Sequence, residues 1–179
     1  MTTSLTESPL APDYDRSAMT TGIVHIGVGG FHRAHEAAYL DRLMRRRAGA
    51  GPHDGAEPTT PGGSCLEWGI CGVGLLPEDA RMRDALESQD HLYTLIRKHP
   101  GGLCDPAVIG SIHDYRLASD APEEVLALLS APTTRIVSLT LTWDGYNIDD
   151  TTGEFRTFAP GAVHDAEHPG EPTTAFGYI

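Results

Sequence analysis

A short strand that runs directly into a glycine cluster and then into a helix constrains the fold of this chain more than any other feature. The β-branched run Gly22-Ile-Val-His-Ile-Gly27 predicts a buried strand, and it ends in the cluster Gly27-Val-Gly-Gly30. Small and apolar residues then recur at close to helical spacing, namely Ala34, Ala37, Ala38, Leu40, Leu43 and Met44. The order strand, glycine turn, helix predicts the opening of a βαβ unit.

Further alternation of strands and helices follows along the chain. Residues 66–73 have strand character, and Pro77-Glu-Asp79 precedes a second helical pattern. Residues 92–96 and 108–112 predict two more strands, which lie on either side of a turn region rich in Pro and Gly and could pair as a hairpin.

The last elements complete the pattern. Asp120-Ala-Pro-Glu123 resembles a capping box before the helical residues 125–129, and residues 135–142 form the clearest strand of the chain. Strands that alternate with helices, with a glycine-rich first loop, predict an α/β fold with a doubly wound, Rossmann-like, mostly parallel sheet.

The charge balance excludes several classes of partner. The chain has 13 Lys and Arg against 25 Asp and Glu, a net charge of −12, which makes nucleic acids and anionic membrane surfaces poor partners. Residues 1–20 lack the apolar core of a secretory signal, no apolar run is long enough to span a bilayer, and three cysteines are too few for a disulfide scaffold. We expect a cytoplasmic protein with a flexible N-terminal arm over 1–20 and one domain over 21–179.

The glycine turn is the candidate cofactor site. Gly27 permits a tight turn, Gly29 lets the backbone approach a pyrophosphate at the helix start, and Arg33 could bind a phosphate or form a surface salt bridge. An ordinary tight βα turn is the alternative, but the strand-to-helix context favours dinucleotide binding. The residues expected at this site are Ile26, Gly27, Val28, Gly29, Gly30, Phe31, His32, Arg33 and Ala34.

Two other residue types near these strands invite a chemical interpretation. His32 and His35 could share a helix face, but metal binding needs a third ligand and none is evident, so we expect packing and polar contacts near the phosphates and no metal site. Cys71 lies in an expected buried strand, where cysteine behaves as a small hydrophobe and not as a nucleophile.

Three segments carry a family resemblance. Residues 23–35, with the distinctive Gly-Phe-His-Arg-Ala-His motif, and residues 68–75 and 136–142 resemble the N-terminal domain of the mannitol 2-dehydrogenase family. These polyol-specific long-chain dehydrogenases include fructuronate reductases, and the resemblance covers most of residues 22–179. It implies a metal-independent, NAD(P)-dependent oxidoreductase that interconverts a sugar alcohol and a ketose, as in mannitol + NAD to fructose + NADH.

The resemblance also implies that this chain holds only the cofactor-binding part. In the family a helical C-terminal domain supplies a lysine base with nearby Asn and His, whereas the neighbours of Lys98, the only lysine here, do not match that motif. We therefore expect truncation near Ile179, no catalytic residue in this chain, no activity alone, and polyol or ketose binding only together with the missing domain. The competing hypothesis is a free-standing nucleotide-binding or regulatory module without catalysis.

Cofactor preference depends on acids that follow the second strand. No acid ends the segment Cys71-Gly-Val-Gly74, and the resemblance puts the discriminating carboxylates at Glu78 and Asp79, which also suit the start of a helix. We expect NAD rather than NADP. Thr142 is the candidate on the nicotinamide side, although the following Trp143 and Asp144 depart from the family's Thr-Glu-Gly-Gly-Tyr.

Overall fold

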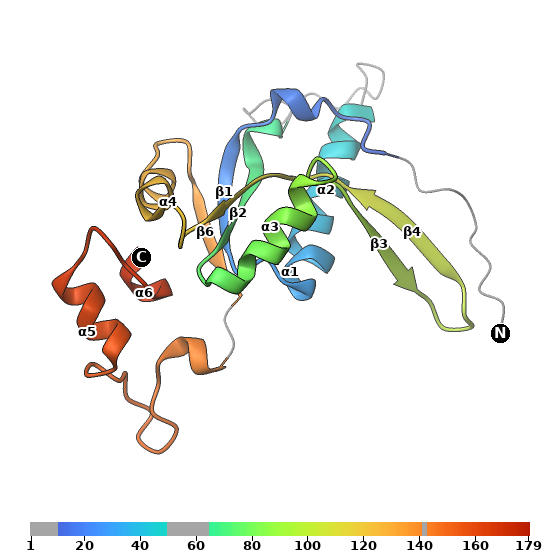
Figure 1. Cartoon of the computed structure of the whole chain (residues 1–179). Helices are drawn as coiled ribbons and strands as arrows, with labels where there is room; N and C mark the ends of the chain where they lie inside the picture. Colours follow the sequence, from blue (N-terminus) through green and yellow to red (C-terminus); the bar gives the residue numbers. More distant parts are fainter. Residues whose placement is uncertain (1–10, 50–64, 141–142) are drawn as a thin grey trace.

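A four-stranded parallel sheet forms the centre of the computed structural model, which describes residues 11–49, 65–140 and 143–179 (Figure 1). Its spatial order is β5-β2-β1-β6, and each neighbouring pair is parallel. In chain order these strands are the third, second, first and fourth of the sheet, which matches the first four strands of the common dinucleotide-binding order 3-2-1-4-5-6. The expected Rossmann-like sheet is thus confirmed. The strands are β1 (Thr21–Ile26), β2 (Gly69–Gly74), β5 (Ile112–Leu117) and β6 (Ile136–Leu139).

Helices cover the two faces of this sheet (Figure 1). Alternation along β1 separates the faces, because Ile23 packs in the same cluster as α2 and α3 residues whereas Val24 packs in the cluster that holds α4 and α6 residues. The helices are α1 (Gly30–Ala34), α2 (Glu36–Gly49), α3 (Ala80–Glu87), α4 (Pro122–Leu129), α5 (Pro160–Glu167) and α6 (Ala175–Tyr178).

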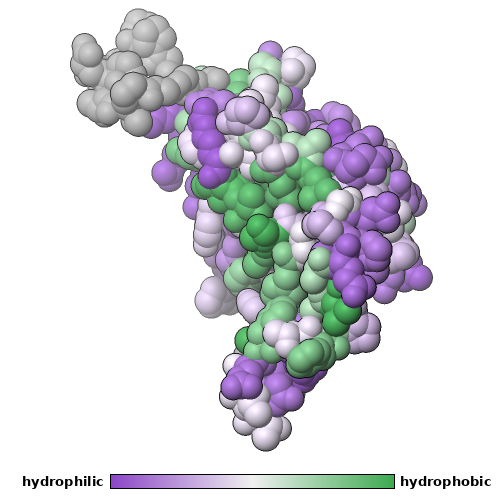
Figure 2. All heavy atoms as spheres, turned by 90° about the vertical axis from the view of Figure 1, so that its left-hand side faces the viewer, coloured by the Kyte–Doolittle hydropathy of each residue, from purple (hydrophilic) through white to green (hydrophobic). Residues whose placement is uncertain are grey.

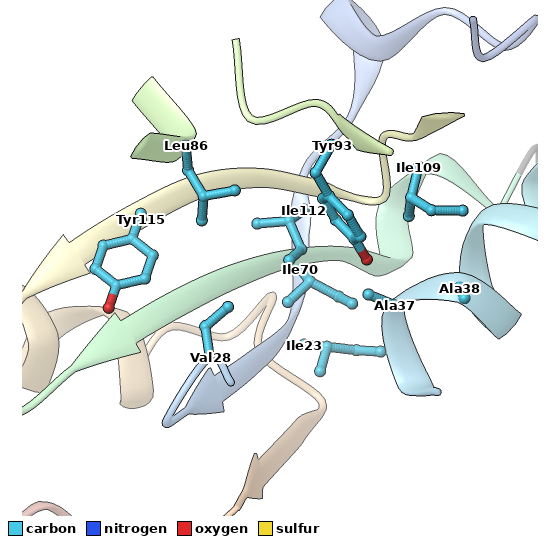
Figure 3. Packing of buried hydrophobic residues seen from close by; sticks show 10 residues of the cluster. All are labelled: Ile23, Val28, Ala37, Ala38, Ile70, Leu86, Tyr93, Ile109, Ile112 and Tyr115. Carbon is cyan, nitrogen blue, oxygen red and sulfur yellow. The ribbon is translucent and has the colours of Figure 1, made fainter. Parts of the chain in front are cut away.

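The larger core cluster lies between the sheet and α2 and α3 (Figure 3). Ile70 and Ile112 lie side by side on adjacent strands and are fully buried. Each such side chain contributes about 1.5–3 kcal/mol when it is removed from water. Tyr93 closes the cluster, and its hydroxyl donates to the Arg33 carbonyl at 2.6 Å. The core therefore fixes the position of the helix that follows the glycine turn.

The expected hairpin is present, but its second strand lies earlier in the chain. β3 (Tyr93–Lys98) pairs antiparallel with β4 (Cys104–Ile109) in a separate two-stranded sheet. The expected strand 108–112 is wrong, because Gly110 and Ser111 separate the end of β4 from the start of β5. In β5, an edge strand of the described sheet, His113, Asp114 and Arg116 interrupt the buried residues, so the strand has no regular hydrophobic pattern.

Other element boundaries also differ from expectation. The expected strand 66–73 starts with the short 3-10 helix η2 (Leu66–Trp68), and the described part of the expected strand 135–142 is regular only in β6. The capping box at Asp120 is wrong: Ala121 is the N-cap, without a side-chain bond, and Asp120 accepts from Arg83 at 2.5 Å instead. The helix after the glycine turn is divided at His35 into α1 and α2.

Part of the expected N-terminal arm belongs to the folded body. Tyr14 and Met19 are buried against Met44, and the Tyr14 hydroxyl donates to Asp41 at 2.7 Å. Arg16, in η1 (Arg16–Ala18), donates to the Gly110 carbonyl at 3.1 Å. The expectation of a loose arm is therefore wrong for residues 14–19, and residues 1–10 lie outside the described residues. None of the helices in the described ranges is both long enough and apolar enough to cross a bilayer.

Candidate cofactor-binding site

The turn after β1 requires glycine at its first position. Gly27 has φ +87°, and a Cβ there would lie 2.8 Å from the Thr140 carbonyl oxygen. The Gly27 amide donates to the Val73 carbonyl at 2.9 Å. The carboxyl ends of β1, β2 and β6 therefore meet at this turn, where open parallel sheets bind ligands.

The next two glycines leave room above the backbone. A Cβ on Gly29 would meet only the Gly27 carbonyl oxygen, at 3.9 Å, and one on Gly30 would meet no atom within 4 Å. Gly29 is the N-cap of α1, whose first amides have no acceptor within the helix. Because α1 has five residues, these N–H groups rather than a long helix dipole would meet a phosphate. The geometry fits the close approach of a dinucleotide backbone.

A cavity of about 480 Å³ lies beside this turn, within the range of small-molecule sites. Most of its lining is apolar, with Asp79, Thr140 and Asn147 among the polar residues. The described lining residues are Ile26, Gly27, Leu75, Leu76, Asp79, Thr140, Gly145, Asn147, Ala159, Gly161, Ala162, Thr173, Thr174, Ala175 and Phe176. The wall from 159 to 176 was missed from sequence, because it reaches the sheet only through the tertiary fold.

Thr140 is the most informative of the residues that we had not expected. It directly follows β6, and its amide donates to the Ile26 carbonyl at 3.0 Å, which continues the strand pairing for one residue. Its position at the carboxyl end of a parallel strand was a usable signal, because ligands bind at such ends.

The two expected acids differ in their surroundings. Asp79 lines the cavity, and its carboxylate accepts from the Leu76 amide at 3.0 Å. Glu78 is exposed and is not part of the cavity lining. A Cβ on Gly74 would lie 2.5 Å from both the Asp79 Cβ and the Tyr115 hydroxyl, so glycine at 74 lets this turn lie close to β2. The structure thus places Asp79, and not Glu78, at the cavity.

The expected turn residues divide into backbone and side-chain groups. Phe31 is exposed, whereas the side chains of Val28 and His32 are buried and face the core. Ala34 is half-buried along a separate groove beside α2 and β4. These four residues could therefore contact a ligand in the cavity only through the backbone or, for Phe31, from the open side.

Arg33 lies beside the turn without lining the cavity. Its Nε donates to the Gly29 carbonyl at 3.3 Å, and its guanidinium lies 5.7 Å from the centre of the Tyr93 ring. Thr142, the remaining expected residue, lies outside the described residues.

Two stacked histidines lie under the turn. His25 and His32 are almost fully buried, and their rings stack 3.5 Å apart with an interplanar angle of 10°. His35 is exposed and its Nδ1 lies 2.8 Å from the Phe31 carbonyl oxygen, so the shared face expected for His32 and His35 is wrong. The break in the helix at His35 turns the two rings apart.

Glu36 lies beside His25 and His32 and is the third polar residue of this cluster, which the sequence spacing did not reveal. Its Oε2 lies 3.4 Å from His25 Nδ1 and 3.9 Å from His32 Nε2. These three residues offer ligand atoms within 4.8 Å of one another. However, an ion must lie near the plane of each imidazole, about 2.0–2.1 Å from its nitrogen. Two parallel rings stacked face to face cannot both meet that requirement, so the arrangement does not fit a shared ion.

Burial and hydrogen bonding set the ionisation of this cluster. Desolvation, followed by the neighbouring His25, lowers the pKa of His32 to about 4, which keeps its ring neutral. The hydrogen bond from His25 lowers the pKa of Glu36 below its ordinary value, against the opposing effect of burial. The cluster therefore holds a carboxylate beside two imidazoles, and His32 stays uncharged at neutral pH.

Comparison with known families agrees with this geometry. A family model described as the mannitol dehydrogenase Rossmann domain matches residues 21–179. Mannitol 2-dehydrogenase from Pyricularia oryzae is 43% identical over 170 residues, covering 94% of this chain and 30% of that protein. The Aspergillus fumigatus mannitol 2-dehydrogenase is 46% identical over 171 residues, which cover 94% of this chain and 31% of that protein.

Solved structures show the same relationship. The structure of Pseudomonas fluorescens mannitol 2-dehydrogenase in a ternary complex with NAD and D-mannitol superimposes with a TM-score of 0.80 at 44% identity, over 93% of this chain and 31% of that one. The structure of a substrate-free D-sorbitol dehydrogenase superimposes with a TM-score of 0.81 at 37% identity, over 98% of this chain and 33% of that one. This chain thus spans about a third of the length of the relatives that it matches.

Proposed function

The chain belongs to the mannitol dehydrogenase family, and from this premise we propose that it binds NAD as the cofactor-binding part of a polyol dehydrogenase. The observation that carries the proposal is the cavity at the carboxyl ends of the parallel strands, directly beside the open turn from Gly27 to Gly30. The relative with the solved ternary complex binds NAD and D-mannitol, which supports the same class of ligand here.

Each part of the site has a role in this proposal. The amides that start α1 hold the pyrophosphate, and Arg33 adds positive charge beside it in a chain whose net charge is −12. Asp79 accepts from a ribose hydroxyl and repels a 2′-phosphate, which favours NAD over NADP. When bound, the nicotinamide supplies the hydride acceptor, and the residues of this chain orient it at the sheet edge.

Oxidation of a polyol requires residues beyond the cofactor-binding part that this chain forms. The relatives are about three times as long, and we propose that their remaining residues bind the polyol and supply the base that takes the alcohol proton. The chain alone then binds cofactor without turnover, because one wall cannot orient a polyol against the nicotinamide. Mannitol oxidation by this chain alone would contradict that part of the proposal.

A titration with both cofactors tests the role of Asp79. We expect NADH to bind more tightly than NADPH by about tenfold, and Asp79→Asn to reduce that preference. Glu78→Gln removes the neighbouring carboxylate, which does not line the cavity, and serves as the matched control with the preference unchanged. Equal affinities in the unsubstituted chain would contradict the assignment of Asp79.

A further inference from the structure

Four polar side chains form a continuous hydrogen-bonded path from the cavity to the surface of α2. Thr140 lines the cavity, and its Oγ1 lies 3.1 Å from His25 Nε2. His25 Nδ1 lies 2.8 Å from Ser138 Oγ. Ser138 Oγ donates to the Glu36 carboxylate at 3.0 Å, and the Glu36 side chain is 33% exposed. The path thus begins at the proposed cofactor site and ends at solvent.

Strand register accounts for this alignment. His25 and Ser138 are direct partners in the parallel pairing of β1 and β6, so their side chains project from the same face. Thr140 lies two residues beyond Ser138 and returns to that face. Glu36, at the first position of α2, reaches the path from the helix that covers it.

Burial isolates the middle of the path from water. The His25 ring is 2% exposed, and the His32 ring stacks over it. The ring nitrogens of His32 have no hydrogen-bond partner among the described residues, so His32 covers His25 without competing for its hydrogen bonds. The groups that face His25 are therefore Thr140, Ser138 and Glu36, with His32 stacked upon it.

We propose that Thr140, His25, Ser138 and Glu36 form a proton relay between the cofactor cavity and solvent. This inference rests on the proposed function, because oxidation of an alcohol by NAD yields a ketone, NADH and one proton that must pass from the site to solvent. Thr140 is the residue at the cavity, and the other three act through it.

The protons balance along the path. Because Ser138 donates its own proton to Glu36, His25 Nδ1 is the donor to Ser138 Oγ, and His25 Nε2 accepts from Thr140. The base that has taken the alcohol proton, or a water molecule that it has protonated, gives a proton to Thr140 Oγ1 as Thr140 passes its own proton to His25 Nε2. His25 passes the Nδ1 proton to Ser138 Oγ, and Ser138 passes its proton to the Glu36 carboxylate, which releases it to water. No bond between heavy atoms forms or breaks. The reverse transfers, which carry one proton from Glu36 to the cavity when a ketone is reduced, return the histidine proton to Nδ1.

Exchange of the buried His25 ring proton with solvent tests the relay in this chain without cofactor. Two-dimensional NMR spectra of the ring nitrogens would follow the Nδ1 proton in the unsubstituted chain, Glu36→Gln and Ser138→Ala. We expect about tenfold slower exchange in both variants, because each removes a group that accepts and passes on the proton. Ser138→Thr keeps the hydroxyl and should restore the rate, whereas Glu87→Gln on α3 is the control for removal of an exposed helix carboxylate.

The amide protons of β1 distinguish a relay from a structural role. A relay leaves their exchange unchanged while the ring proton slows. Equal ring rates in all variants, faster ring exchange in step with the β1 amides, or a neutral ring with its proton on Nε2 would overturn the proposal. A ring proton that exchanges too fast to follow even in Ser138→Ala would do the same. Failure of NADH to bind would overturn the proposed function and would leave these rates untouched.

Discussion

The two strands that flank β1 differ sharply in burial, although each places an isoleucine beside Ile23. Ile70 in β2 and Ile136 in β6 are both register partners of Ile23, one on each side. Ile70 is 0% exposed, whereas Ile136 is 45% exposed. β2 has β5 as its other neighbour and helices over its faces, but within the described residues β6 has no strand beyond it. A hydrophobic pattern thus predicts a strand without revealing how many neighbours will cover it.

The exposed flank also carries an apolar surface. Ile136 and Val137 are adjacent and point to opposite faces, yet both are exposed. Figure 2, which views the side that carries α4, α5 and α6, shows a hydrophobic band across that side. All-parallel sheets are ordinarily covered on both faces. The β6 side of the sheet therefore has less packing to lose than the β2 side.

Removal of the flanking isoleucines gives the largest contrast. Ile70→Ala should lower the free energy of unfolding by about 2–5 kcal/mol, because it leaves a cavity between the sheet and the helices α2 and α3. Ile136→Ala should lower it by less than about 1 kcal/mol, since much of that side chain is already in water. Urea unfolding of both variants measures the difference. Equal losses in the free energy of unfolding would contradict the conclusion that β2 is more tightly packed than β6.

Acid should lower the free energy of unfolding, because His32 is buried beside β1 with a lowered pKa. Its pKa is about 4 in the folded chain against 6.5 for the free side chain, so the unfolded chain binds more protons between these values. The free energy of unfolding should then fall as the pH drops from 6.5 towards 4, by up to about 3 kcal/mol from this residue.

Comparison of two histidine variants isolates the part due to His32. His32→Phe keeps an aromatic ring beside His25 and should flatten the fall, whereas His168→Phe at an exposed position should leave it unchanged. The same pH slope in His32→Phe as in the unsubstituted chain would show that His32 is not the group responsible.

The glycine turn gives an intermediate effect on stability. Gly27→Ala places a Cβ at φ +87° and 2.8 Å from the Thr140 carbonyl, which should cost about 1–2 kcal/mol. Affinity for NADH should fall with it, because β6 and the turn must separate. Gly153 also has positive φ but no atom within 4 Å of its Cβ position, so Gly153→Ala is the matched control for strain without a clash. Unchanged NADH affinity in Gly27→Ala would contradict the proposal that this turn is part of the cofactor site.

The smallest effect is expected at the exposed flank. Val137→Lys should change the free energy of unfolding by less than about 0.5 kcal/mol, because the side chain already faces water. It should reduce self-association, since a charge on an edge strand discourages pairing with another strand. Light scattering after size-exclusion chromatography measures this. A large loss of stability would show that β6 is more tightly packed than its exposure indicates.

Local patterns in the sequence were sufficient to predict the fold class and the turn. The run from Gly22 to Gly30 encodes its own strand and glycine turn, and β1 lies where it was expected. A helix follows the turn as expected, but it is divided at His35 into α1 and α2. The strand β5 could not be found in the same way, because His113, Asp114 and Arg116 interrupt its apolar pattern. Its identity as a strand comes from pairing with β2, a contact distant in sequence.

Sequence reasoning found candidate site residues only where a local motif indicates them. Of the residues expected to bind the cofactor, Ile26, Gly27 and Asp79 line the cavity, whereas Asn147 enters from a part of the chain that the glycine motif does not indicate. The path through His25 and Glu36 needed the register between β1 and β6, which no local pattern encodes. Tertiary contacts therefore account for most of what sequence reasoning missed.

NADH binding followed residue by residue is the most direct test of the cofactor site. Amide NMR spectra of the chain would be recorded during a titration with NADH to millimolar concentration. We predict saturable shifts concentrated at residues 26–33 and at Thr140, with little change in the hairpin of β3 and β4. No saturable shift at millimolar NADH, or shifts confined to residues remote from the turn, would contradict the account.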